Sequence, residues 1–137
     1  MKMHVHPATI IQSISKKDLE GAKVILINMP LRETAVPNFT PQGPLLLATN
    51  LRENYGVHAT IIDLNGYRIK DELARQRNLP NGRHLTIEEA FQLIQTHIRV
   101  HGEPDLVGFS GKITTLRWQE NIAKIIQSII LVMKDTM

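Results

Sequence analysis

Three short apolar runs, separated by longer segments with helical periodicity, constrain the fold of this chain most strongly. The runs are KVILIN, ATIIDL and DLVGF, at residues 23–28, 59–64 and 105–109. Continuous runs of this kind, rich in β-branched residues, are typical of strands buried on both faces of a parallel sheet. Strands that alternate with helices are joined by right-handed crossovers. The sequence therefore predicts an α/β domain built on a parallel sheet of three strands, with helices between them.

The first two helices expected around this sheet have recognisable ends. Pro44 should lie in the first turn of a helix that stops at Gly56. Its apolar side is expected to comprise Leu45, Leu46, Ala48, Leu51 and Tyr55. Thr86 should cap the second helix through a capping box with Glu89, and Gly102 should end it. The apolar face expected for that helix consists of Ile87, Ala90, Phe91, Ile94 and Ile98.

The third helix is expected over residues 115–130, with a buried face made of Ile122, Ile125, Ile126 and Ile129. Residues 129–137 have a composition that a strand could also have. No turn residue separates them from the helix, however, and Met133 continues the apolar stripe four residues after Ile129. We therefore favour a long helix over a fourth strand.

Composition excludes several classes of protein. The chain of 137 residues suits one domain, which we divide into an N-terminal extension (1–20) and an α/β domain (21–137). A net charge of +3 and scattered basic residues do not predict a nucleic-acid partner. The absence of cysteine excludes disulfides, thiolate zinc sites and an iron–sulfur cluster held by this chain. No apolar run approaches the roughly 18 residues of a membrane span, so we expect a cytoplasmic protein without a membrane partner.

Two histidine pairs have spacings that can hold a metal ion. They are His4 with His6 and His97 with His101. We favour a mobile terminus for the first pair and a surface or helix-end role for the second, so no metal ligand is predicted. Trp118 could cover a cofactor, although packing in the core or an interface is favoured. No nucleophile–base or carboxylate pair can be assigned, so no catalytic residue is predicted.

Ligands of such sheets bind beyond the carboxyl ends of the strands, where the strand order reverses. Two loops meet there, at residues 28–43 and 110–115. Small residues in these loops allow close approach to the backbone, and hydroxyl groups and helix N-terminal amides can bind a polar tail or phosphate. Asp63 and Asn65, which end the second strand, could contact a ligand or cap the turn, with neither reading favoured.

The segment DLVGFSGKITTL at residues 105–116 resembles the third strand of cobalamin-binding domains in methionine synthase and in cobalamin-dependent radical SAM enzymes. The segments KVILINMPLRE and ATIIDLN are similar to the radical SAM branch, and the resemblance covers about residues 22–130. It implies that Ser110 and Thr114 line the slot for the nucleotide tail of cobalamin. The cofactor-binding residues it suggests are Asn28, Pro30, Leu31, Arg32, Gly43, Ser110, Gly111, Ile113 and Thr114.

The sequence departs from this family in three ways. The loop 28–43 contains no histidine, so cobalamin would lack a cobalt ligand from that loop, as it does in much of the radical SAM branch. The three-cysteine cluster motif is missing, so the chain alone is not expected to be catalytic. The family fold is a three-layer, flavodoxin-like (Rossmann-like) parallel sheet with the strand order 2-1-3-4-5. This chain stops before the last two strands, so the resemblance implies an abbreviated domain of three strands in the order 2-1-3. Its strand at 105–109 would then be an exposed edge, which predicts a homo-oligomer.

Three functional hypotheses remain open at this point. The first is a cobalamin-binding module related to radical SAM methyltransferase-type enzymes. The second is an oligomerising α/β module that has lost cofactor binding. The third is a domain for another nucleotide-bearing ligand. Two absences count against it, because the sequence has neither a Ser/Thr-rich first loop nor a G-x-G-x-x-G motif.

Overall fold

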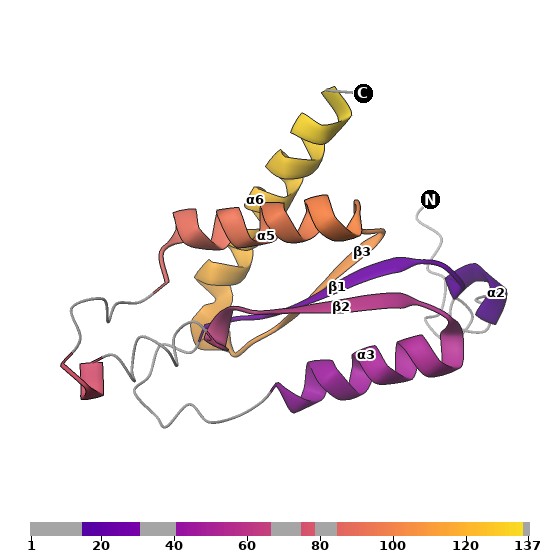
Figure 1. Cartoon of the computed structure of the whole chain (residues 1–137), viewed down its shortest axis with the longest axis horizontal. Coiled ribbons are helices and arrows are strands. Elements are labelled where there is room, and N and C mark those ends of the chain that lie inside the picture. Colours follow the sequence, from indigo (N-terminus) through magenta and orange to yellow (C-terminus); the bar gives the residue numbers. More distant parts are fainter. Residues whose placement is uncertain (1–14, 31–40, 67–74, 79–84, 136–137) are drawn as a thin grey trace, which may run out of the picture.

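The computed structural model describes residues 15–30, 41–66, 75–78 and 85–135, and its centre is one parallel sheet (Figure 1). The strands are β1 (Lys23–Asn28), β2 (His58–Asp63) and β3 (Leu106–Ser110). Their order is β2-β1-β3, with β1 paired in parallel to both neighbours. The predicted α/β fold and strand order are therefore confirmed, and the arrangement is consistent with a flavodoxin-like sheet.

Helices cover both faces of this sheet. They are α2 (Lys16–Leu19), α3 (Gln42–Tyr55), α5 (Ile87–His101), the short 3₁₀ helix η1 (Ile113–Thr115) and α6 (Leu116–Asp135). Figure 1 shows α3 on one face and α5 and α6 on the other. The crossovers through α3 and α5 therefore use opposite faces, which produces three layers. Within the described residues, no helix is long and apolar enough to cross a membrane.

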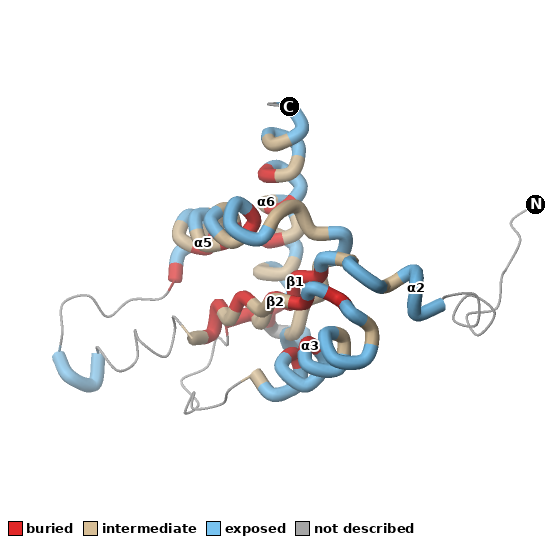
Figure 2. The backbone as a smooth tube through the Cα atoms, turned by 45° about the vertical axis from the view of Figure 1, so that its right-hand side comes forward, coloured by how far each residue is buried: buried red, intermediate tan, exposed pale blue. Residues whose placement is uncertain are grey.

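Two apolar clusters hold these layers together, one on each face of the sheet. Val24 and Leu26 of β1 pack in the cluster under α3, whereas Ile25 and Ile27 pack in the cluster under α5 and α6. This division follows from the alternation of side chains along a strand. Figure 2 shows that buried residues are concentrated in β1, in β2 and in the helix sides that face the sheet, whereas β3 contains none. Leu19 of α2 packs against the α3-side cluster, so ordered packing extends into the predicted N-terminal extension.

The predicted ends of α3 and α5 are confirmed. Thr86 Oγ1 accepts a hydrogen bond from Glu89 N at 3.2 Å, and Glu89 Oε2 accepts one from Thr86 N at 3.1 Å, which is the capping box. Gly102 ends α5 at a φ of 92°, and Gly56 ends α3 at a φ of 64°. Both values favour glycine because a β-carbon is strained there.

The predicted bounds of β2 (59–64) and β3 (105–109) are each wrong by one residue at both ends, since the strands are His58–Asp63 and Leu106–Ser110. An aspartate stands at two of these four boundaries. β2 ends at Asp63, and Leu64 to Gly66 form a helical turn in place of the predicted turn at Asn65-Gly66. Asp63 Oδ1 accepts a hydrogen bond from Asn65 N at 3.1 Å, which starts that turn. β3 begins after Asp105, whose Oδ2 accepts a hydrogen bond from Lys23 N at 2.8 Å.

The predicted apolar side of α3 is partly wrong. Leu45 and Leu46 are exposed, Leu46 by 72% of its surface. The buried stripe instead runs through Pro44 and Ala48, and it continues through the half-buried Leu51 and Tyr55. Its spacings of four, three and four follow the helical period, and positions 45 and 46 lie outside it.

Residues 129–137 were expected to continue the last helix and not to form a fourth strand. The helix continues to Asp135, so the long helix favoured for residues 129–137 is confirmed up to that residue. Ile122, Ile126 and Ile129 are buried as predicted, whereas Ile125 is only half-buried.

Candidate functional site

A row of polar side chains crosses the carboxyl edge of the sheet. Asn28 is the register partner of Asp63 on β2 and of Ser110 on β3. By alternation these three residues share the face of the sheet that α3 covers. Asn28 Nδ2 donates a hydrogen bond to Asp63 Oδ1 at 2.9 Å, so the Asn28 amide is already engaged. Asp63 was expected either to contact a ligand or to cap the turn after β2. The structure shows the cap, since the Asp63 carboxylate also accepts a hydrogen bond from Asn65 N.

A groove of about 410 Å³ begins beside this row, between the first turn of α3 and β3. Three glycines contribute to its walls, which are formed by Leu26, Gly43, Pro44, Leu47, Gly108, Phe109, Ser110 and Gly111. Ser110 supplies the only hydroxyl among these lining residues, and no described residue hydrogen-bonds to that hydroxyl. The groove is therefore largely apolar, with one hydroxyl group in its wall.

The three glycines of the groove differ in what surrounds them. A β-carbon at Gly43 would have no heavy atom within 4 Å, so that position faces open space. At Gly108 it would lie 2.9 Å from Leu26 Cδ2, so a side chain there would occupy the groove wall. At Gly111 it would meet Thr115 Oγ1, and it would lie 2.9 Å from Gln119 Nε2 and 3.2 Å from Met29 Cγ. Gly111 thus has a packing role whether or not a ligand is bound.

The structure brings some of the predicted cofactor residues together. Gly43, Ser110 and Gly111 line one groove, and Asn28 pairs with Ser110 in the sheet. Pro30 is buried, which leaves its ring inside the protein. Leu31 and Arg32 lie outside the described residues, as does the side chain of Thr114.

An exposed apolar group stands next to the groove. Ile113, a predicted cofactor residue, is 89% exposed two positions after Gly111. Leu47 of the groove wall and Leu116 at the start of α6 are also exposed. Large apolar side chains gathered at one end of a domain commonly mark a contact site.

Sequence reasoning missed Gly108, Leu26 and Leu47 as parts of this groove. The available signal was alternation, because Gly108 precedes Ser110 by two positions and so shares its face of β3. Leu26 precedes Asn28 by the same step on β1. Trp118, in contrast, is half-buried against the α5-side cluster, as predicted.

The prediction for His97 is partly wrong, because this residue is half-buried and bonded across to the sheet. Its Nε2 lies 2.7 Å from Thr60 Oγ1, and its ring centroid is 4.3 Å from that of His101. Burial, and then the nearby charge of His101, hold the pKa of His97 below its ordinary value. His101 is exposed, as predicted. The described residues contain no group of three or more His, Asp or Glu side chains placed to hold a metal ion.

Comparison with models of known families, with curated proteins and with solved structures finds no match to this chain. The functional argument therefore depends on the sequence motifs and on the geometry of the groove.

Proposed function

We propose that this chain is a cobalamin-binding module whose groove holds the nucleotide tail of the cofactor, and that it is not catalytic alone. One observation carries the proposal. Gly43, Ser110 and Gly111 come from two segments far apart in the sequence, each singled out by the family resemblance, and they line the same groove.

The chemistry of the groove suits an aromatic base attached to a sugar phosphate. Leu26 and Leu47 provide apolar surface for a flat ring, and the glycines keep the slot free of side chains. Binding sites for small molecules typically combine such apolar walls with a few polar groups. Ser110 supplies a hydroxyl that can donate or accept a hydrogen bond.

The first turn of α3 adds a second polar feature at the groove. A helix leaves its first amide groups without intrahelical partners, and its N-terminus carries a partial positive charge. Among the described residues, Pro44 has no N–H group and Leu45 N donates to Pro41 O at 3.0 Å, whereas Gln42 N and Gly43 N of α3 have no backbone acceptor. These groups favour the phosphate of a nucleotide tail.

The cofactor, when bound, would supply its own organometallic chemistry. The part of the chain is to hold and orient it. Because residues 28–43 contain no histidine, the module would hold cobalamin without an imidazole ligand from that loop.

The test is retention of cobalamin by the purified chain. The protein is mixed with hydroxocobalamin or methylcobalamin, desalted, and measured by its visible absorbance. We expect equimolar retention by the native chain and its loss in Ser110→Tyr, where the ring would fill the groove. Ser128→Tyr is the matched control, because Ser128 is exposed on α6, away from the groove. Failure of the folded native chain to retain cobalamin, or undiminished retention by Ser110→Tyr, would overturn the proposal.

A second candidate function is self-association through β3. In the described sheet β3 pairs only with β1, and Leu106 at its start is 63% exposed. An unpaired edge can add a strand from another chain, and pairing of two copies about a two-fold axis closes the assembly. Light scattering during dilution should show a dimer that dissociates, weakened in Leu106→Lys. A monomer at tens of micromolar with no change on dilution would refute this role.

A further inference from the structure

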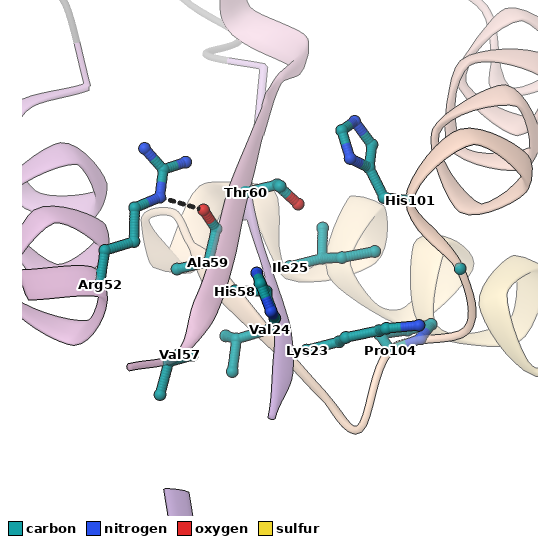
Figure 3. A pocket seen from close by; sticks show the side chains of 11 residues that line it. Lys23, Val24, Ile25, Arg52, Val57, His58, Ala59, Thr60, His101 and Pro104 are labelled. Atoms are coloured by element: carbon teal, nitrogen blue, oxygen red, sulfur yellow. Dashed lines mark hydrogen bonds between the residues drawn. The ribbon is translucent and has the colours of Figure 1, made fainter. Parts of the chain in front are cut away.

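A second cavity of about 410 Å³ lies at the opposite end of the sheet, around the amino ends of β1 and β2 (Figure 3). It is separate from the groove described above and shares no lining residue with it. Its walls come from β1, β2, α3 and the end of α5, and consist of Lys23, Val24, Ile25, Arg52, Val57, His58, Ala59, Thr60, His101, Gly102 and Pro104.

Two strands and one helix place three of its basic groups. Lys23 on β1 and His58 on β2 are direct register partners, so their backbones are adjacent. His101 belongs to the last turn of α5, and Figure 3 shows it across the cavity from β2, on the same side as Lys23. The hydroxyl of Thr60, next along this face, is bonded to His97 and is therefore occupied.

The Lys23 ammonium group lies close to Gly102. A β-carbon at Gly102 would lie 2.5 Å from Lys23 Nζ, so the lysine side chain rests against the backbone at the end of α5. The negative pole of a helix amounts to about half an elementary charge. It can hold the ammonium in place without neutralising it.

The cavity is basic, and no carboxylate lines it. Within the described part of the chain, no acidic side chain pairs with the ammonium of Lys23 or the imidazoles of His58 and His101. The nearby Asp105 carboxylate accepts from the backbone N of Lys23, at 2.8 Å. Arg52 lies on the other side of β2, where its Nε donates to Ala59 O at 2.6 Å (Figure 3).

We propose that this cavity binds a phosphate group, either as inorganic phosphate or on a small phosphomonoester. A phosphate monoester carries nearly two negative charges and three acceptor oxygens. The cavity offers three donors from three elements, Lys23, His58 and His101, with no competing carboxylate in its walls. A carboxylate ligand, with two oxygens, would leave one of these three donors without an acceptor. The proposal is independent of cobalamin binding.

The test is a calorimetric titration of the full chain with inorganic phosphate at low ionic strength. Glycerol 3-phosphate in a parallel titration distinguishes a site for the free anion from one for an ester. Lys23→Gln and His101→Gln should each raise the Kd about tenfold, because each removes one charge-assisted hydrogen bond. Both side chains are exposed, so these variants should fold, which circular dichroism checks. Lys124→Gln, which removes an exposed charge of α6 outside the cavity, should leave the Kd unchanged.

Two further outcomes decide the proposal. Ser110→Tyr, which blocks the groove at the other end of the sheet, should bind phosphate as the native chain does. The proposal is overturned if Lys23→Gln and His101→Gln bind phosphate as tightly as the native chain. It is also overturned if acetate binds as tightly as phosphate.

Discussion

Replacing Gly111 with alanine should destabilise the fold, whereas the same replacement at Gly43 should stabilise it. The new methyl group at Gly111 would overlap Thr115 Oγ1 and crowd Gln119 Nε2 at 2.9 Å. Thr115 is fully buried and cannot simply turn away, because its hydroxyl donates to Lys112 O at 2.7 Å and accepts from Gln119 Nε2 at 3.1 Å. The substitution should therefore strain the connection between β3 and α6.

The magnitude follows from two opposing contributions. Overpacking of a tight site costs about 1–3 kcal/mol. Loss of glycine entropy from the unfolded chain returns about 0.5–1 kcal/mol. The free energy of unfolding should thus fall by about 1–2 kcal/mol in Gly111→Ala. In Gly43→Ala no atom is crowded and the position is helical, so it should rise by about 0.5–1 kcal/mol.

Urea unfolding followed by circular dichroism measures both variants against the native chain. With a slope of about 1–2 kcal/mol per molar urea, the midpoint should fall by about 1 M for Gly111→Ala. It should rise by a few tenths of a molar for Gly43→Ala. An unchanged or higher midpoint in Gly111→Ala would refute the packing argument around Thr115.

The remaining predictions concern α5. The pKa of His97 is lower in the folded chain than its ordinary value of about 6.5 in the unfolded chain. As the pH falls below about 6.5, His97 therefore takes up a proton more readily in the unfolded chain than in the folded one. The stability linked to His97 is therefore present above pH 6.5 and lost as the pH falls. Urea midpoints should decline from pH 7 to pH 5 more steeply in the native chain than in His97→Gln, and equal declines would contradict this. Thr86→Ala should cost about 1 kcal/mol through loss of the helix cap, measured by urea unfolding. Thr96→Ala, an exposed change within the same helix, should have little effect, and a similar loss there would argue against capping.

Local patterns in the sequence were sufficient for the alternation of strands and helices and for the helix caps, whereas the order of the strands in the sheet came from the resemblance to a known fold. The apolar runs and the Thr86–Glu89 pair act over a few residues, so they can be recognised without the fold. The end of β2 and the start of β3 could not be placed to the residue, because Asp63 and Asp105 form hydrogen bonds at these two boundaries that the sequence pattern does not show. The exposure of Leu46 was likewise missed, since its neighbours are also apolar and only the observed packing selects the buried stripe.

The two candidate sites differ in how far the sequence could predict them. Three residues of the groove, Ser110, Gly111 and Gly43, were predicted from the sequence because they lie in segments that resemble a known family. The basic cavity was not predicted, because Lys23, His58 and His101 share no motif spacing. Only the register of β1 with β2 and the final turn of α5 bring them to one place. Such a site depends on pairing between distant segments, which composition and periodicity do not reveal.

The pairing of β1 with two neighbours also has a consequence for the order of folding. Asn28 and its partner Asp63 are 35 positions apart, whereas Lys23 and Asp105, which join β1 to the start of β3, are 82 apart. Closing the longer loop costs about 0.8 kcal/mol more entropy on a logarithmic scale. The β1–α3–β2 unit should therefore assemble first, and β3 should dock late.

In the native protein β3 is an edge strand without a fully buried residue, so we expect it to separate from the sheet more readily than the central strand β1. Its departure would remove Gly108, Ser110 and Gly111 from the groove while leaving the Lys23–His58 pair intact. Amide hydrogen exchange should accordingly be faster in β3 than in β1. The wall of the basic cavity at Pro104 is tied to β1 by the hydrogen bonds between Asp105 and Lys23, so the two candidate sites would loosen together while β1 and β2 stay paired.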